Sequence, residues 1–352
     1  MPEGDRLGFL DFVRGIAAFA VLLQHTGETL WPSVNWATHQ YVNIGRFGVV
    51  AFFLVSGFII PFSLERGGSV RRFWIGRFFR LYPLYWVSLV AILVMYQFRN
   101  DALTPDFQAH TLLHAIVNFT MIQELVGIPH AIGLYYTLTV ELVFYTVCAA
   151  LFAAGLLGRS VRNAWVVLGA SAVLGTVAPF VIGHRAPMAG LFYVSSMFIG
   201  TVVYRYSTGY ARRADVSALV GAAALLGLVG SYVNYVHFTD LNDADPFTFR
   251  GATIAWSIAY LFFFGAFAMR QERFPRPFLW LGRVSYSLYL MHPLVVVAVA
   301  HWTVRPLALL VVVVARLALA DLTYRFVELP FQALGRRVQQ RARAPIAPTP
   351  SR

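Results

Sequence analysis

The chain has 352 residues, of which 58% are hydrophobic and only 12% are charged, and its mean hydropathy is +0.63. Soluble domains carry about 25% charged residues, so this composition excludes a soluble enzyme and indicates a polytopic membrane protein. The net charge of +12 comes from 28 arginines without a single lysine, and because these cluster in short loops and in the C-terminal tail, we interpret them as a topology signal and expect no nucleic acid partner.

Hydrophobic runs of span length recur along the whole chain. A transmembrane helix needs about 20 residues, and we predict ten of them, at 8–30, 45–65, 76–97, 134–156, 163–183, 187–204, 216–236, 251–269, 279–301 and 303–327. The run at 110–124 is shorter and more polar. The predicted fold class is therefore all-α: a polytopic membrane helix bundle of about ten transmembrane helices plus a short re-entrant or interfacial helix at 110–124.

The placement of the arginines predicts the orientation of this bundle. They crowd five segments, whereas the connections 31–44 and 237–249 contain none; the arginine-rich segments are 66–80, 157–162, 205–213, 270–283 and 336–343. By the positive-inside rule these segments are cytoplasmic, which puts both termini in the cytoplasm and requires 110–124 not to cross. We divide the chain into a membrane domain, 1–335, and an Arg- and Pro-rich cytoplasmic tail, 336–352, which we expect to be disordered.

The first predicted span carries two ionisable residues on one face. Arg14 and His25 are eleven residues apart, which returns to nearly the same side of a helix and separates them by roughly 16 Å along its axis. Ionisable groups inside a span cost on the order of 2.5–3.5 kcal/mol and are functional candidates by default. The alternative is an arginine that reaches to the interface and a histidine bonded to a neighbouring helix.

Glu141 lies about seven residues from the outer end of the fifth run. Counted along its helix, we expect it at roughly the depth of His25. A carboxylate that accepts from one ring nitrogen leaves the other as a base, so we predict that Glu141 orients His25. The alternative is a structural pair between Glu141 and an arginine such as Arg46.

Arg77 and Arg80 stand one helical turn apart at the cytoplasmic entry to the third span, next to Pro83. Arginine forks suit phosphates, so an anionic cytosolic ligand is one interpretation, and ordinary positive-inside anchoring is the other. In the second span, small residues let helices approach closely, and we assign Gly57 to packing.

Near the end of the chain, Tyr286, Tyr289 and His292 repeat every three residues along one helix. We interpret Tyr286 as packing, and Tyr289 and His292 as candidates to line a cavity. Arg325 and Glu328 are predicted to form an ion pair at a helix end. A single cysteine, Cys148, excludes an internal disulfide, and we expect no metal.

Five ordered motifs between residues 7 and 330 resemble the bacterial membrane acyltransferase family 3, whose members acetylate O-antigens, Nod factors, macrolide sugars and other glycans. They are Arg14-x10-His25, Phe52 to Phe58 (FFLVSGF), Arg77/Arg80/Pro83, Tyr136 to Glu141 (YTLTVE), and Leu281 to His292 (LGRVSYSLYLMH). Tyr136 and Thr139 replace the usual Trp and Ser of the family, which concerns the fit of the acceptor. Many members carry an outer esterase-like domain; none follows residue 352, so we expect the acceptor to reach the membrane core directly.

The resemblance implies an O-acyltransferase of the bacterial inner membrane. The donor would be cytosolic acyl-CoA, with acetyl as the expected acyl group, and the acceptor a hydroxyl of a carbohydrate or glycolipid at the outer side of the lipid bilayer. The expected roles are catalysis by His25 and Glu141, donor binding by Arg14, Arg77 and Arg80, and substrate binding by Tyr136, Tyr289 and His292. Either His25 acts as a general base, or it forms a covalent acyl intermediate.

Two other functions fit a helical membrane protein. A secondary transporter of a small polar solute also has many spans with buried ionisable residues near the midplane, but we find no internal repeat in this sequence. A non-catalytic membrane scaffold would not need ionisable groups at matched depth. Release of CoA thiol separates the enzyme from both.

Overall fold

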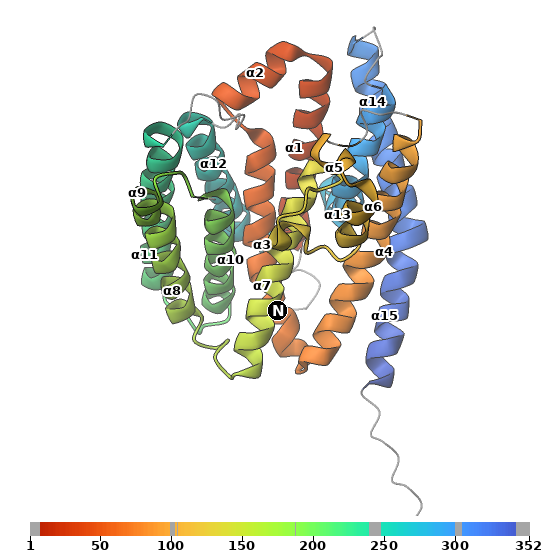
Figure 1. Cartoon of the computed structure of the whole chain (residues 1–352). Coiled ribbons are helices and arrows are strands. Elements are labelled where there is room, and N and C mark those ends of the chain that lie inside the picture. The colour runs from red at the N-terminus through yellow and green to blue at the C-terminus, as the bar shows by residue number, and fades with distance from the viewer. Residues whose placement is uncertain are drawn as a thin grey trace, which may run out of the picture.

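The computed structural model describes residues 8–98, 103, 105–186, 188–238, 248–299 and 305–342. This part of the chain is a bundle of long helices and contains no β-strand (Figure 1). The predicted all-α membrane bundle is thereby confirmed. Most of the predicted connection 237–249 and the end of the predicted tail, 343–352, lie outside the described residues.

The helices follow one another through short connections, in the order α1 (Gly8–Leu30), α2 (Pro32–Gln40), α3 (Ile44–Gly67), α4 (Val70–Tyr96), α5 (Pro105–Gln108), α6 (Thr111–Asn118), the 3₁₀ turns η2 (Gln123–Val126) and η3 (Gly133–Tyr135), α7 (Tyr136–Ala153), α8 (Ser160–Ala172), η4 (Val173–Val177), α9 (Ala178–Ile182), α10 (Met188–Ser207), α11 (Arg213–Tyr232), η5 (Val233–His237), α12 (Phe249–Ala268), α13 (Arg276–Val299), α14 (Arg305–Thr323), η6 (Tyr324–Glu328) and α15 (Leu329–Arg341). The segments η4 and η6 are π-helical turns that join two α-helical segments, and η5 is a π-helical turn at the end of α11. Such wide turns often mark functional or strained positions.

Eight helical segments of the described chain are long and apolar enough to cross a membrane. They are Gly8–Leu30, Ile44–Gly67, Val70–Tyr96, Gly133–Ala153, Ser160–Ile182, Met188–Ser207, Arg213–His237 and Phe249–Ala268. Each coincides with one of the first eight predicted spans. Helices α13 and α14 occupy the positions of the last two, and the count of ten with cytoplasmic termini stays a prediction.

The segment between α4 and α7 is folded back against these two helices. Helix α6 has only eight residues, or roughly 12 Å, against a hydrocarbon core of about 30 Å, so it is too short to cross. The fully buried Asn118 fixes the segment, because its side chain donates to the carbonyls of His114 (2.8 Å) and Pro129 (3.0 Å) and accepts from the Ala131 amide (3.1 Å). The Tyr85 hydroxyl on α4 donates to the Asn118 carbonyl over 2.6 Å.

The arginine-rich connections gather at one end of the bundle. Figure 1 shows the α3–α4, α7–α8 and α10–α11 turns and the end of α15 at the bottom, while α2 lies across the top. At the arginine-rich end Arg205 of α10, which is 6% exposed, forms a salt bridge with Glu65 of α3. The structure therefore places these charged segments together, as the sequence predicts.

Helix α1 is held between α3 and α13 by close helix crossings. A Cβ atom on Gly48 would lie 2.5 Å from the Ala17 carbonyl oxygen, and one on Gly282 would lie 2.0 Å from that of Asp11. Only glycine allows backbones to approach this closely. These crossings fix the depth of every side chain on α1.

Helices α3 and α10 also cross with their backbones in contact. A Cβ atom on Gly57 would lie 1.9 Å from the Met197 carbonyl oxygen, and one on Gly200 would lie 2.2 Å from that of Leu54. The Thr201 hydroxyl donates to the Gly57 carbonyl over 2.9 Å across this crossing. The packing role predicted for Gly57 is confirmed.

Helix α15 extends six residues beyond the predicted domain boundary at 335, because it continues to Arg341. It packs along α4, where a Cβ atom on Gly335 would lie 2.7 Å from the Cβ atom of Phe79. The Gln339 side chain donates to the Arg72 carbonyl over 2.6 Å. Residues 336–341 are thus an ordered part of the bundle, which corrects the predicted start of the disordered tail.

Candidate functional site

Three cavities follow one another through the bundle. The inner cavity lies at the arginine-rich end, and its polar lining residues are Ser63, Arg72, Arg77, Arg80, Gln332, Arg336 and Gln339. The central cavity is lined by Asp11, Arg14, Ser56, Arg77, Arg80, Thr137, Glu141, Tyr145, Tyr286 and Tyr289, among others. The outer cavity has Gln24, His25, Glu28, Asn43, Arg46, Tyr136, Tyr193, Tyr289 and His292 among its lining residues.

Neighbouring cavities share wall residues. Arg77 and Arg80 line both the inner and the central cavity. Val49 and Tyr289 line both the central and the outer cavity. The cavities therefore form a continuous row from the arginine-rich end of the bundle to the opposite end.

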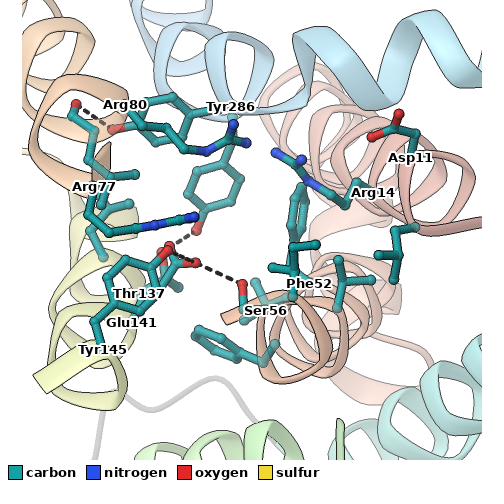
Figure 2. Close-up of a pocket in the computed structure, with 18 residues that line it drawn as sticks. Asp11, Arg14, Phe52, Ser56, Arg77, Arg80, Thr137, Glu141, Tyr145 and Tyr286 are labelled. Atoms are coloured by element: carbon teal, nitrogen blue, oxygen red, sulfur yellow. Dashed lines mark hydrogen bonds between the residues drawn. The ribbon is translucent and has the colours of Figure 1, made fainter. Parts of the chain in front are cut away.

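Glu141 of α7 projects into the central cavity, where it accepts two hydrogen bonds (Figure 2). The Ser56 hydroxyl of α3 donates to its Oε1 atom over 2.7 Å, and the Tyr145 hydroxyl, one turn further along α7, donates to the same atom over 2.6 Å. Arg14 of α1 points into this cavity from the facing side. Acidic and basic groups from α1, α4 and α7 thus line one space.

Arg77 stands at the boundary between the inner and central cavities. Its Nη2 atom donates to the Ser63 hydroxyl over 3.1 Å. Its guanidinium also lies over the rings of Phe73 and Tyr145, at 5.4 and 5.5 Å from their centroids, which is within the range of cation–π attraction. Arg80 follows one turn later on α4 and lines the same two cavities.

Tyr286 also lines the central cavity, although we interpreted it as packing. Its hydroxyl donates to the Leu81 carbonyl of α4 over 2.7 Å. Tyr145 and Ser56, which bind Glu141, were likewise not predicted as site residues. The spacing of four residues between Glu141 and Tyr145 is a signal that identifies such a pair on one helix face.

In the outer cavity, His25 is paired with a carboxylate of its own helix. The His25 Nδ1 atom lies 3.2 Å from Oε2 of Glu28. Glu28 is itself held by Gln24 and Thr38, each of which donates to its Oε1 atom over 2.7 Å. A carboxylate at Nδ1 fixes the tautomer of the imidazole and leaves Nε2 to accept a proton.

His292 of α13 stacks on His25, with ring centroids 5.3 Å apart and an interplanar angle of 17°. Its Nδ1 atom lies 2.8 Å from the Tyr289 carbonyl oxygen. Because a carbonyl only accepts, Nδ1 carries the proton, and Nε2 of the neutral ring is the acceptor. Two imidazoles with the same tautomer therefore lie side by side in the outer cavity.

Tyr289 forms the wall between the central and outer cavities. Its hydroxyl lies 2.9 Å from the hydroxyl of Thr137 and 3.3 Å from the Leu134 carbonyl oxygen, at the start of α7. Its ring lies 6.1 Å from that of His292 and 6.1 Å from that of Phe52. The side chain is 8% exposed, so it separates two polar spaces while it contacts both.

The predicted contact between His25 and Glu141 is wrong. The partner of His25 is Glu28, and Glu141 binds Ser56 and Tyr145 in a different cavity. The physical reason is depth: the chain before α7 folds back into the bundle, so α7 does not start at the end of the bundle opposite the arginine-rich end. Tyr136, its first residue, shares the outer cavity with His25, and Glu141 lies about 7.5 Å further along the helix.

The remaining predicted residues fall into two of the cavities. Arg14, Arg77 and Arg80 line the central one, while Tyr136 and His292 line the outer one. Arg46, the alternative partner of Glu141, also lines the outer cavity, at 5.9 Å from the centroid of the Tyr235 ring. Among the described residues, no group of three or more His, Cys, Asp or Glu side chains has the arrangement of a metal site.

The predicted ion pair at the end of the bundle is wrong as well. Arg325 pairs with Asp321, with 2.7 Å between Nε and Oδ2. Glu328 instead accepts from the Ser287 hydroxyl over 2.5 Å and from Gln332 over 3.3 Å. Arg325 and Glu328 both lie within the π-helical turn η6, which changes the spacing that an α-helix would give.

A family model described as an acyltransferase domain matches residues 7–325. The matched residues include the lining of all three cavities, except for the residues of α15 that line the inner cavity. The chain belongs to this acyltransferase family. The resemblance noted from the five motifs is therefore confirmed, and no solved structure matches the chain.

Curated relatives share the same family. The chain is 22% identical to the peptidoglycan O-acetyltransferase OatA of Listeria monocytogenes, over 93% of its own length and 56% of the relative. It is 23% identical to the O-acetyltransferase OatA of Staphylococcus aureus, over 93% of its length and 57% of the relative. The putative peptidoglycan O-acetyltransferase YrhL of Bacillus subtilis is 22% identical, over 93% and 55%. The chain spans little more than half the length of these proteins.

Proposed function

We propose that the chain is an O-acyltransferase of the bacterial plasma membrane, which moves an acyl group from cytosolic acyl-CoA to a hydroxyl of a carbohydrate acceptor at the outer side. Acetyl is the expected acyl group. The observation that carries this proposal is the continuous row of cavities, with arginines at one end and two stacked imidazoles at the other. The row connects a site for an anionic donor to a site for base catalysis.

The donor would enter from the arginine-rich end. Arg77 and Arg80 line two successive cavities there, and guanidinium groups suit the phosphates of a CoA thioester. Arg14 lies further inside and faces the thioester arm. The thioester carbonyl then belongs at the boundary between the central and outer cavities, beside Tyr289, because only there can it meet an acceptor from the other side.

The proton transfer is assigned to the outer cavity. Glu28 orients His25 through Nδ1, and the Nε2 atom takes the proton from the acceptor hydroxyl as general base. The acceptor oxygen forms the new ester bond with the acyl carbon, the C–S bond breaks, and the proton passes to the leaving thiolate to give CoA thiol. A covalent acyl intermediate on His25 is the alternative course of the same transfer.

Three further residues would position the acceptor. Tyr136, Tyr289 and His292 line the outer cavity around His25, and this mixture of aromatic rings and hydrogen-bonding groups suits a sugar. The matched relatives are described as O-acetyltransferases, two of them of peptidoglycan. A glycan of the cell envelope is therefore the proposed acceptor class.

Glu141 receives a role on the donor side. It lines the cavity that also holds Arg14, Arg77 and Arg80, so its carboxylate offsets part of their charge when no anionic donor is bound. Its hydrogen bonds to Ser56 and Tyr145 tie α3 to α7 at this level. We therefore assign Glu141 to the shape and charge of the donor cavity.

The test uses the purified full chain in sealed vesicles. Acetyl-CoA is supplied on the side of the arginine-rich end and a soluble peptidoglycan fragment on the other; thiol release is followed with a chromogenic reagent and acetylation by mass spectrometry. The proposal expects thiol release that depends on the acceptor and equals the acetyl groups transferred. Solute uptake without thiol release would instead identify a transporter.

A further inference from the structure

The inner cavity is lined by positive charge. Arginines line it from two helices, Arg72, Arg77 and Arg80 of α4 and Arg336 of α15, and no acidic residue of the described chain does so. Elsewhere at this end, arginines have carboxylate partners: Arg205 pairs with Glu65 and Arg212 with Asp215.

Arg72, Arg80 and Arg336 have no carboxylate partner within the part of the chain that the structure describes. A cluster of like charges without directly paired carboxylates is suited to an anion from outside. The inner cavity therefore has the charge of an anion-binding site.

The cavity is built by a close contact between α4 and α15. A Cβ atom on Gly76 would lie 2.6 Å from Nε2 of Gln339, and the same nitrogen donates to the Arg72 carbonyl over 2.6 Å. One turn earlier on α15, Gly335 lies against Phe79. These contacts hold α15 so that Arg336, which follows Gly335, lines the cavity, whereas its neighbour Arg337 does not; both side chains are exposed.

We propose that the inner cavity binds the nucleotide phosphates of the donor, with Arg336 on α15 as a recognition residue. This inference rests on the proposed function and refines it, because it assigns the adenosine 3′,5′-bisphosphate end of CoA to a subsite separate from the thioester. Guanidinium forks match phosphate geometry and form charge-assisted hydrogen bonds. Arg77 and Arg80 connect this subsite to the central cavity, where the pantetheine arm continues.

A phosphate of an anionic lipid headgroup has the same chemistry, and a binding experiment distinguishes the two sources. Equilibrium binding of adenosine 3′,5′-bisphosphate is measured on the purified full chain in neutral detergent. We expect Arg336→Ala to weaken binding by roughly 10- to 100-fold, the loss of one charge-assisted interaction, and Arg337→Ala to leave it unchanged. Equal losses in both variants, or no binding in the wild type, would overturn the inference in favour of lipid anchoring.

A comparison of two donors supplies an independent readout. Arg336→Ala should raise the apparent KM for acetyl-CoA while kcat is retained, but should not change the KM for S-acetylpantetheine, which lacks the nucleotide. Equal effects on both donors would contradict the subsite. If the wild type binds the bisphosphate but transfers no acetyl group from CoA, the proposed function fails while the nucleotide subsite stands.

Discussion

The imidazole rings of His25 and His292 stack nearly in parallel, 5.3 Å apart, although 267 positions separate them in the chain. Each ring uses its Nδ1 atom for a contact within its own helix, with Glu28 on α1 and with the Tyr289 carbonyl on α13. The outer cavity therefore holds these two imidazoles, of which, within the described residues, only His25 has a carboxylate partner.

Substitutions at His25 and Glu28 should identify the general base of the acyl transfer. We expect His25→Ala to lower kcat by about 10²- to 10⁴-fold, the usual contribution of a general base, and Glu28→Gln to lower it by less. Because the two residues act as a unit, the double variant should be little worse than His25→Ala. The rate is followed as CoA thiol release.

The chain offers a matched control for this pair. Glu124 contacts His130 over 2.5 Å but lies on η2, outside all three cavities. Glu124→Gln should leave the rate unchanged. A wild-type rate in His25→Ala would assign the base to His292 instead.

Glu141 should act independently of Glu28. The two carboxylates line different cavities and, in the described part of the chain, share no hydrogen-bond partner, so the free-energy effects of Glu28→Gln and Glu141→Gln on kcat/KM should add within about 0.5 kcal/mol. Steady-state kinetics of both single variants and of the double variant measure this sum. Strong non-additivity would restore a direct link between Glu141 and the base.

Arg80 should contribute to donor affinity. We expect Arg80→Ala to raise the apparent KM for acetyl-CoA by roughly 10- to 100-fold, and Arg80→Lys to recover only part, since lysine keeps the charge and loses the fork. Arg71, which is exposed and lines none of the cavities, provides the control Arg71→Ala. Unchanged donor kinetics in both Arg80 variants would return this arginine to the topology signal.

Cysteine labelling tests the orientation of the bundle. In a chain whose Cys148 has been replaced by Ala, Trp36→Cys and Tyr210→Cys introduce thiols at positions where 58% and 79% of the native side chain is exposed, at opposite ends of the bundle. In intact cells an impermeant maleimide should label position 36 and not position 210. Labelling of both from one side would contradict the predicted topology.

The crossing of α3 and α10 should be intolerant of a single methyl group. At Gly200 the added Cβ atom would lie 2.2 Å from the Leu54 carbonyl oxygen, whereas at Gly190 of the same helix it would meet nothing within 4 Å. We expect Gly200→Ala to lower the free energy of unfolding by about 1–3 kcal/mol or more through overpacking. Gly190→Ala should be neutral or slightly stabilising, and thermal unfolding in detergent compares the two.

The spans and most of the polar lining of the cavities could be predicted from the sequence, because charged residues inside hydrophobic runs are rare. Arg14, His25 and Glu141 were predicted as site residues on this basis, and all three line cavities. Which of these residues share a cavity could not be predicted. Counting residues from the outer surface requires a helix to start there, and the folded-back segment around Asn118 lowers the start of α7 in a way that hydropathy does not encode.

Two further features could not be predicted from the positions of the spans. The polar character of residues 336–341 resembles a disordered tail, but the glycines at 76 and 335 allow α15 to pack on α4. Tyr286 looked like an ordinary interfacial aromatic, and only the three-dimensional contact with Leu81 shows that it lines the central cavity. Both depend on which helix faces which, and a single sequence does not contain that information.

The wall that Tyr289 forms between the central and outer cavities has an electrical consequence for the cell. Moving one elementary charge across a membrane at 100 mV involves about 2.3 kcal/mol, and CoA carries several negative charges. An acetyl group carries none. In the proposed reaction the acyl group passes Tyr289 outward and one proton passes inward to the thiolate, while the nucleotide stays among the arginines. This exchange moves no net charge, so a cytosolic thioester modifies the cell surface without discharging the membrane potential.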